Sequence, residues 1–170
     1  MTSSGAGDAI GRVLIAERNP LVVAALRGLF AEHPRFAIAE TARTSRELCA
    51  KLASTKADCV LLSWQLDDAE APDVLTDLGR CGLDPRIVLF ADTNTPSVVN
   101  ETIRMGINGL CYQFEDPEIL FTTLTAVIAW VAACRAKHSC WSSPIGSTAL
   151  MGLSPPAESE HFGGMIGQTR

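Results

Sequence analysis

Short apolar runs alternate along the chain with longer stretches in which apolar residues recur at helical spacing. The short runs are typical of strands buried on both faces and cover residues 12–16, 36–39, 59–62, 87–90 and 110–112. The longer stretches predict amphipathic helices over residues 20–30, 45–52, 74–81, 96–105 and 117–131. Asn19 is a suitable cap for the first of these helices, and Pro20 suits its first position.

Five strand–helix units in alternation predict an α/β fold with a parallel sheet that helices cover on both faces. Because crossovers between parallel strands are right-handed, few topologies remain. We expect the doubly wound, flavodoxin-like order 2-1-3-4-5. Ligands of such sheets bind at the carboxyl ends of the strands. The candidate site residues at those ends are Glu17, Arg18, Ser63, Ala91, Asp92 and Gln113.

The periodic pattern predicts one domain at residues 11–138, with a disordered N-terminus at 1–10 and a disordered Ser/Gly/Pro-rich tail at 139–170. The first residues lack the charged and apolar regions of a signal peptide, and no apolar stretch is long enough for a membrane span. These features predict a cytoplasmic protein without a membrane contact. A net charge of −5 and the absence of a Lys/Arg run argue against nucleic-acid binding by this chain.

Six cysteines occur in the chain, none in a CxxC pair, and four of them fall within apolar patterns. We therefore expect reduced, mostly buried thiols that act as small apolar side chains, with zinc or disulfide use as the less favoured alternative. Glu17 and Asp92 could form a metal pair, but Arg18 between them argues against it. The sequence thus predicts no metal site.

Four segments together resemble the receiver domains of two-component response regulators, of the type normally attached to a helix-turn-helix output domain. Residues 13–22 (VLIAERNPLV) resemble the first strand and the start of its helix, and residues 58–66 (DCVLLSWQL) resemble the third strand. Residues 86–91 resemble the fourth strand, and residues 106–113 (GINGLCYQ) resemble the Gly-Ala-x-Gly-Tyr-x-x-Lys segment. The resemblance covers about residues 12–136 and implies a CheY-like fold.

The resemblance also implies a phosphorylation pocket, and the chain departs from it at almost every position. Glu17 and Arg18 stand in place of an acidic pair, and Ser63 in place of the phosphoacceptor Asp. The remaining positions are substituted as well: Ala91 replaces the hydroxyl residue, Gln113 the lysine, and Leu110 the switch aromatic. We therefore expect a pseudo-receiver that has lost phosphorylation and Mg²⁺ binding, with no cofactor and no catalytic residues.

Local compensation is expected within this degenerate pocket. Ser63 is a poor nucleophile without an adjacent base, and the sequence shows none. Gln113 could hydrogen-bond Ser63, and Arg18 could pair with Glu17 or Asp92. Trp64, which follows Ser63 into a loop, is expected to be half-buried.

The last predicted helix contains more large apolar residues than one stripe against the sheet requires. Phe121 and Trp130 are the surplus and predict an interface. Receivers often pair through the fourth helix, fifth strand and fifth helix. We therefore expect a homodimer or another protein partner on that face.

The leading functional hypothesis is a non-catalytic signalling module of the phosphorelay type that acts through protein–protein contacts, as a transcription regulator without its own DNA-binding domain. A second hypothesis gives the pocket a small anion or ligand, attracted by Arg18. A third is an enzyme on a flavodoxin-like fold. The absence of GxGxxG, GxSxG and P-loop motifs makes the third the weakest.

Overall fold

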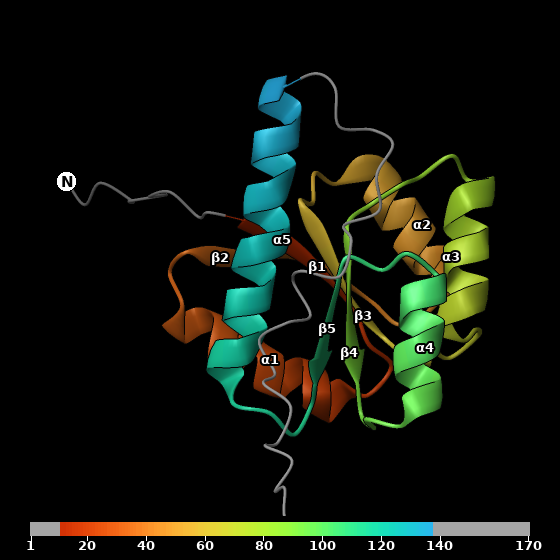
Figure 1. Ribbon diagram of the computed structural model, residues 1–170, viewed down its shortest axis with the longest axis horizontal. Helices are drawn as coiled ribbons and strands as arrows, with labels where there is room; N and C mark the ends of the chain where they lie inside the picture. Colours follow the sequence, from red (N-terminus) through yellow and green to blue (C-terminus); the bar gives the residue numbers. More distant parts are fainter. Residues whose placement is uncertain (1–10, 138–170) are drawn as a thin grey trace, which may run out of the picture.

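The computed structural model describes residues 11–137, which form five strands and five helices in strict alternation (Figure 1). The strands are β1 (Gly11–Ala16), β2 (Phe36–Ala42), β3 (Cys59–Ser63), β4 (Ile87–Ala91) and β5 (Gly109–Tyr112). The helices are α1 (Pro20–Glu32), α2 (Ser45–Ser54), α3 (Ala71–Arg80), α4 (Pro96–Arg104) and α5 (Pro117–Lys137). The predicted terminal tails, together with residue 138, lie outside the described residues.

All strand pairs are parallel, and the sheet has the order β2-β1-β3-β4-β5. The predicted fold class is therefore confirmed. α1 and α5 cover one face of the sheet, and α2, α3 and α4 cover the other (Figure 1). None of the helices within residues 11–137 combines the length and apolarity that a bilayer crossing requires.

The two faces of the sheet belong to two separate apolar cores. Along β1, Val13 and Ile15 pack toward α1 and α5, whereas Leu14 and Ala16 pack toward α2 and α3. This alternation follows from the two-residue period of a strand. All residues of β3 and β4 are buried, as expected for inner strands covered on both sides. Polar side chains in the sheet are therefore confined to the strand ends and to the outer strands.

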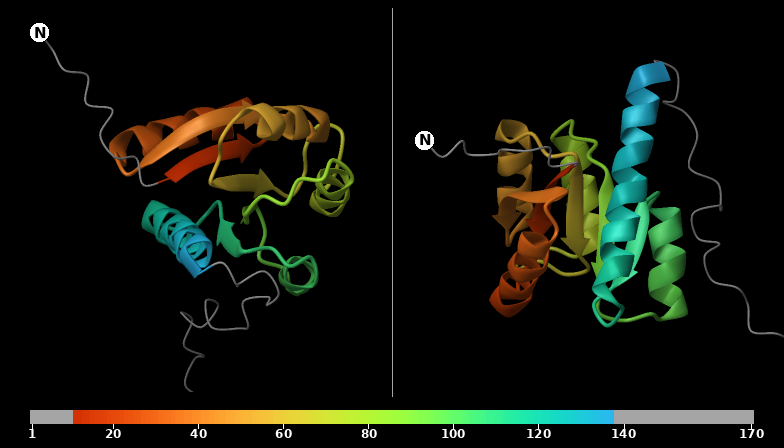
Figure 2. Two further views of the ribbon diagram at one scale, coloured as in Figure 1. Left: turned by 90° about the horizontal axis from the view of Figure 1, so that it is seen from above. Right: turned by 90° about the vertical axis from the view of Figure 1, so that its left-hand side faces the viewer.

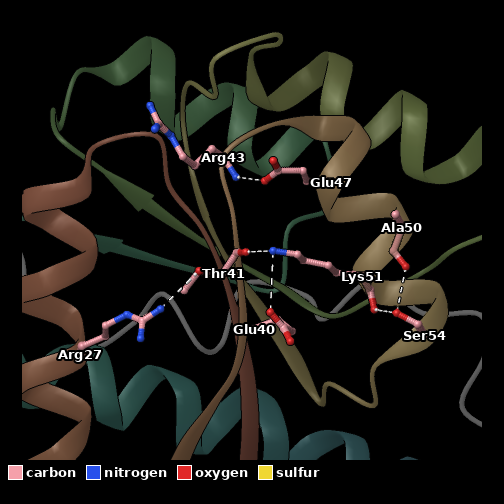
Figure 3. Close-up of polar contacts among 8 residues, drawn as sticks. All are labelled: Arg27, Glu40, Thr41, Arg43, Glu47, Ala50, Lys51 and Ser54. Carbon is pink, nitrogen blue, oxygen red and sulfur yellow. Dashed lines mark hydrogen bonds and ion pairs between the residues drawn. The ribbon is translucent and has the colours of Figure 1, made fainter.

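Charged side chains from the helices on either side of the edge strand β2 contact this strand (Figure 3). Lys51 of α2 donates a hydrogen bond to the Thr41 carbonyl and lies 3.7 Å from a carboxylate oxygen of Glu40. On the other side, the Arg27 guanidinium of α1 lies 3.5 Å from the Thr41 hydroxyl. An unpaired strand edge invites pairing with another chain, and charged groups over it oppose this. β2 is thus a protected edge.

Helix α5 packs against both the sheet and α1, so its apolar surface is larger than one stripe. Phe121 is only 3% exposed, and its ring centroid lies 5.3 Å from that of Phe30 and 5.5 Å from that of Phe36. The prediction that Phe121 is an interface residue is therefore wrong. Trp130 is half-buried, with the Arg86 guanidinium 4.2 Å from its ring centroid. A role for Trp130 in an interface stays a prediction.

Gly109 at the start of β5 allows α5 to approach the sheet closely. A Cβ atom at this position would lie 2.8 Å from Cγ2 of Thr123 and 3.2 Å from Cγ2 of Val88. Carbon atoms do not pack at the shorter of these distances without displacement. A larger residue at position 109 would therefore push α5 away from β5.

Replacing Phe121 by Ala should destabilise the domain because it leaves a cavity between α1, β2 and α5. The expected loss in the free energy of unfolding is about 3–5 kcal/mol. Ile119, which is 43% exposed on the same helix, provides the matched control, and Ile119→Ala should change stability by less than about 1 kcal/mol. Urea denaturation of the two variants measures the difference. Equal losses in both would contradict the core position of Phe121.

Candidate functional site

The candidate site lies at the edge of the sheet where the carboxyl ends of β1, β3, β4 and β5 meet. Backbone hydrogen bonds continue past the strands and hold these ends in register. The Glu17 amide donates to the Ala42 carbonyl at 2.9 Å, and the Gln113 amide donates to the Ala91 carbonyl at 2.8 Å. The expected site residues therefore do gather at one edge, as the parallel topology requires. Their side chains differ sharply in burial.

Glu17 and Ser63 form the buried centre of the site. Their exposed fractions are 4% and 5%, and the Ser63 hydroxyl donates a hydrogen bond to Oε2 of Glu17. The backbone amide of Asn19 donates to the other carboxylate oxygen, Oε1, at 2.6 Å. Each oxygen of the buried carboxylate thus has a donor, which offsets the cost of removing the charge from water. Among the side chains that the structure describes, those of residues 11–130, no buried nitrogen or oxygen lacks a hydrogen-bond partner.

This contact overturns the expectation that Ser63 has no base beside it. The sequence separates the two residues by 46 positions, and only the pairing of β1 with β3 brings them together. A carboxylate that accepts a serine hydrogen bond can in principle receive its proton. However, the hydroxyl is almost fully covered, so a substrate would have little access to it. The geometry is that of a closed internal hydrogen bond.

Arg18 lies outside this centre. Its side chain is exposed, and none of the ion pairs among the side chains of residues 11–130 includes Arg18 or Asp92. The expected pairing of Arg18 with Glu17 or Asp92 is therefore wrong. The physical reason is that the chain bends at Arg18, between the end of β1 and the start of α1, so this side chain lies outside both apolar cores.

The residues at the ends of β4 and β5 also take no part in a polar network with Ser63. Ala91 is 1% exposed and packs in the core toward α2 and α3, together with the half-buried switch-position residue Leu110. Gln113 is exposed, and no hydrogen bond among the described residues joins its side chain to Ser63. The expected Gln113–Ser63 bond is therefore wrong, because the Ser63 proton is directed to Glu17.

The loop after β3 has a structural role that the sequence did not reveal. Trp64 is half-buried against the core toward α2 and α3, and its carbonyl accepts a hydrogen bond from the Ala71 amide at 2.8 Å. Asp68 accepts a hydrogen bond from the Ser45 amide at 2.7 Å, at the first residue of α2. An acidic residue at a helix start satisfies a free amide and favours the helix dipole. Asp68 is thus part of the joint between this loop and α2, not a freely solvated residue.

The oxygens present at the centre do not suit Mg²⁺. This ion prefers octahedral coordination by several oxygens, with at least one or two carboxylates free to bind it. Here one carboxylate is present, and both of its oxygens already accept hydrogen bonds. In residues 11–130, where side chains are described, no group of three or more His, Cys, Asp or Glu side chains is arranged to hold a metal ion.

Replacing Ser63 by Ala should leave Oε2 of Glu17 buried without a donor. The expected loss in the free energy of unfolding is about 1–3 kcal/mol near neutral pH. Glu17→Gln is the matched control, because an amide can accept from the Asn19 amide and donate to the Ser63 oxygen. We expect the smaller loss for Glu17→Gln, as measured by chemical denaturation. A neutral Ser63→Ala would show that the hydrogen bond contributes little.

No family model matches the chain. A curated relative, described as a probable transcriptional regulatory protein SgaR of Hyphomicrobium methylovorum, is 26% identical over 115 residues. That match covers 68% of the chain and 54% of the relative, so the chain spans about half the length of the curated relative that it matches.

Solved structures with the same arrangement of strands and helices include a two-component response regulator of the LuxR family from Aurantimonas sp. SI85-9A1. It has a TM-score of 0.64 and 19% identity, over 75% of this chain and 96% of that one. The receiver domain of the Francisella response regulator 1452 has a TM-score of 0.63 and 12% identity, over 71% of this chain and 98% of that one. The chain therefore has the fold of a response-regulator receiver domain.

Proposed function

We propose that the chain is a regulatory module of the receiver type that works without phosphorylation and without Mg²⁺, through contacts with other proteins. The observation that carries this proposal is the buried hydrogen bond between Ser63 and Glu17. It occupies the position at which the receiver resemblance implies a phosphoacceptor carboxylate. A pocket that satisfies its own polar groups needs no phosphoryl group to be stable.

Phosphoryl transfer to a receiver would require groups that this edge of the sheet lacks. The acceptor must attack phosphorus, while Mg²⁺ and a cation neutralise the charge on the transferring oxygens. In this chain a covered hydroxyl stands in place of the acceptor, and the neutral Gln113 stands in place of the lysine. The fixed negative charge of Glu17 would also repel a phosphoryl group that no metal neutralises. The same charge disfavours the alternative of a small-anion site, and the covered hydroxyl disfavours an enzyme.

The regulated process that we propose is transcription, as the description of the curated relative suggests. With a net charge of −5, the chain is poorly suited to contact DNA itself. Its effect would therefore reach DNA through a partner protein. We propose a cytoplasmic location for this role.

We further propose that a second copy of the chain binds the face formed by α4, β5 and α5. β5 is an edge strand that lies between these two helices (Figure 2). Two large apolar side chains are exposed beside it: Ile103 of α4 is 57% exposed, and Phe114, which follows β5, is 61% exposed and stacks on Tyr112. Exposed apolar groups around an unpaired strand favour association.

The domain should not accept phosphate from a small phosphodonor, because the acceptor and metal ligands are missing. The test is to incubate the full chain with acetyl phosphate and Mg²⁺ and to record its intact mass. We expect no gain of about 80 Da, the mass of a phosphoryl group. Ser63→Ala, treated in the same way, separates reaction at this site from reaction elsewhere. A gain seen in the wild type and lost in Ser63→Ala would overturn the proposal.

The α4–β5–α5 face should support a dimer whose formation does not depend on a phosphodonor. The double variant Ile103→Glu, Phe114→Glu should sediment as a folded monomer, since a charge buried in an interface without a partner is costly. Leu21→Glu is the matched control, because Leu21 is 78% exposed on α1, away from that face. It should remain a dimer. A wild-type chain that is monomeric at tens of micromolar in sedimentation experiments would contradict this interface.

A further inference from the structure

Helices α2 and α3 lie side by side on one face of the sheet (Figure 1) and are joined by a partly buried polar contact. The Ser45 hydroxyl in the first turn of α2 donates to Oδ2 of Asp77 in the last turn of α3 at 2.8 Å. Ser45 is 2% exposed. Because both helices cross over between parallel strands, they run in the same general direction. The contact therefore fixes which turn of α2 faces which turn of α3.

One turn further along each helix is a cysteine. Cys49 follows Ser45 by four positions, and Cys81 follows Asp77 by four positions, which places each cysteine on the same helix face as the residue before it. Because the Ser45–Asp77 hydrogen bond aligns the two helices, this spacing places the two thiols opposite each other between α2 and α3. The influence of Cys81 on the pKa of Cys49, which it helps to raise, agrees with this placement. Cys49 is half-buried, whereas Cys81, the residue at the C-terminal end of α3, is exposed. The pair is thus open to solvent on one side.

We propose that Cys49 and Cys81 form a peroxide-sensitive pair that closes to a disulfide between α2 and α3. In the first step, the Cys81 sulfur attacks one oxygen of hydrogen peroxide, the O–O bond breaks, and Cys81 becomes a sulfenic acid while one water is released. In the second step, the Cys49 sulfur attacks the Cys81 sulfur, and the hydroxyl leaves as a second water. Two thiols are oxidised, and one peroxide is reduced to two waters.

The surroundings of the four described free cysteines set the order of these steps. Burial raises the pKa of Cys59 to about 12 and that of Cys111 to about 11, and both side chains are 1% exposed, so these core thiols are inert. Burial and the neighbouring Cys81 thiol raise the pKa of Cys49 to about 11, which keeps it protonated near neutral pH. The exposed Cys81 is therefore the thiol that meets peroxide first, and Cys49 is the resolving thiol.

The disulfide would tie the end of α3 to α2 across a loop of about 30 residues. This loop contains β3, Ser63 and Trp64, and its Asp68 already holds the start of α2. Closing a loop of this length restricts the unfolded chain, and we expect the thermal midpoint to rise by on the order of 10 °C. Oxidation would thereby fix the segment that follows the Glu17–Ser63 contact.

Peptide mapping of the full chain tests the proposal directly. The chain is treated with hydrogen peroxide, alkylated without reduction and digested with trypsin, which cleaves after Lys and Arg. Cys49 falls in the peptide of residues 47–51 (ELCAK) and Cys81 in the peptide of residues 81–86 (CGLDPR), whereas the other four cysteines lie in different peptides. The expected main product is these two peptides joined, two hydrogens lighter than their sum. Treatment with dithiothreitol should separate them and reverse the rise in thermal midpoint.

Two variants distinguish this pair from other oxidation. Cys81→Ser removes an exposed thiol without disturbing the core, and it should abolish the linked peptide and the rise in thermal midpoint. Cys111→Ala removes a buried thiol and should retain both. A wild-type chain in which Cys81 ends as sulfinic acid while Cys49 stays alkylated would overturn the proposal. So would a main product that links Cys81 to a second chain or to another cysteine.

Discussion

The burial of the sheet on both faces is the constraint from which the other features of this domain follow. The central positions of the inner strands β1, β3 and β4 do not face solvent, so their side chains are apolar, and polar side chains occur only near the strand ends. Polar chemistry is thereby displaced to the carboxyl ends of the strands, where the backbone leaves the sheet. The same constraint leaves two outer strands with different protection. β2 is covered by charges from Arg27 and Lys51, whereas β5 is bordered by the exposed Ile103 and Phe114.

At the carboxyl edge, removing a carboxylate from water without a counterion requires donors for both of its oxygens. Glu17 receives them from the Asn19 amide and the Ser63 hydroxyl. This arrangement has the opposite electrostatic character to a phosphate or metal site, because it satisfies a negative charge locally and offers no further ligand. In the function that we propose, the receiver fold is kept while a structural hydrogen bond takes the place of the pocket's chemistry.

The helices differ in the number of elements that they pack against. α5 packs in the core with the sheet through Leu124 and contacts α1 through Phe121, so it needs apolar residues on more than one side, although it is not apolar enough along its length to cross a membrane. α2 and α3 instead contact each other through the Ser45–Asp77 hydrogen bond, and the sequence spacing places Cys49 and Cys81 one turn further along the two helices. A disulfide there would add to a contact that the two helices already make.

The sequence by itself determined the order of strands and helices, the sheet order 2-1-3-4-5 and the residues at its carboxyl edge, because periodicity and right-handed crossovers are local rules. It placed the start of α3 at residue 74, whereas the helix begins at Ala71, since Pro72 in the first turn gives no periodic signal. Only the tertiary structure decided that Ser63 meets Glu17, that Arg18 is exposed, that Phe121 is buried and that the turns with Cys49 and Cys81 lie on neighbouring helices. These outcomes depend on side-chain direction and on contacts between elements distant in the chain, and neither is encoded in the spacing of residues along it.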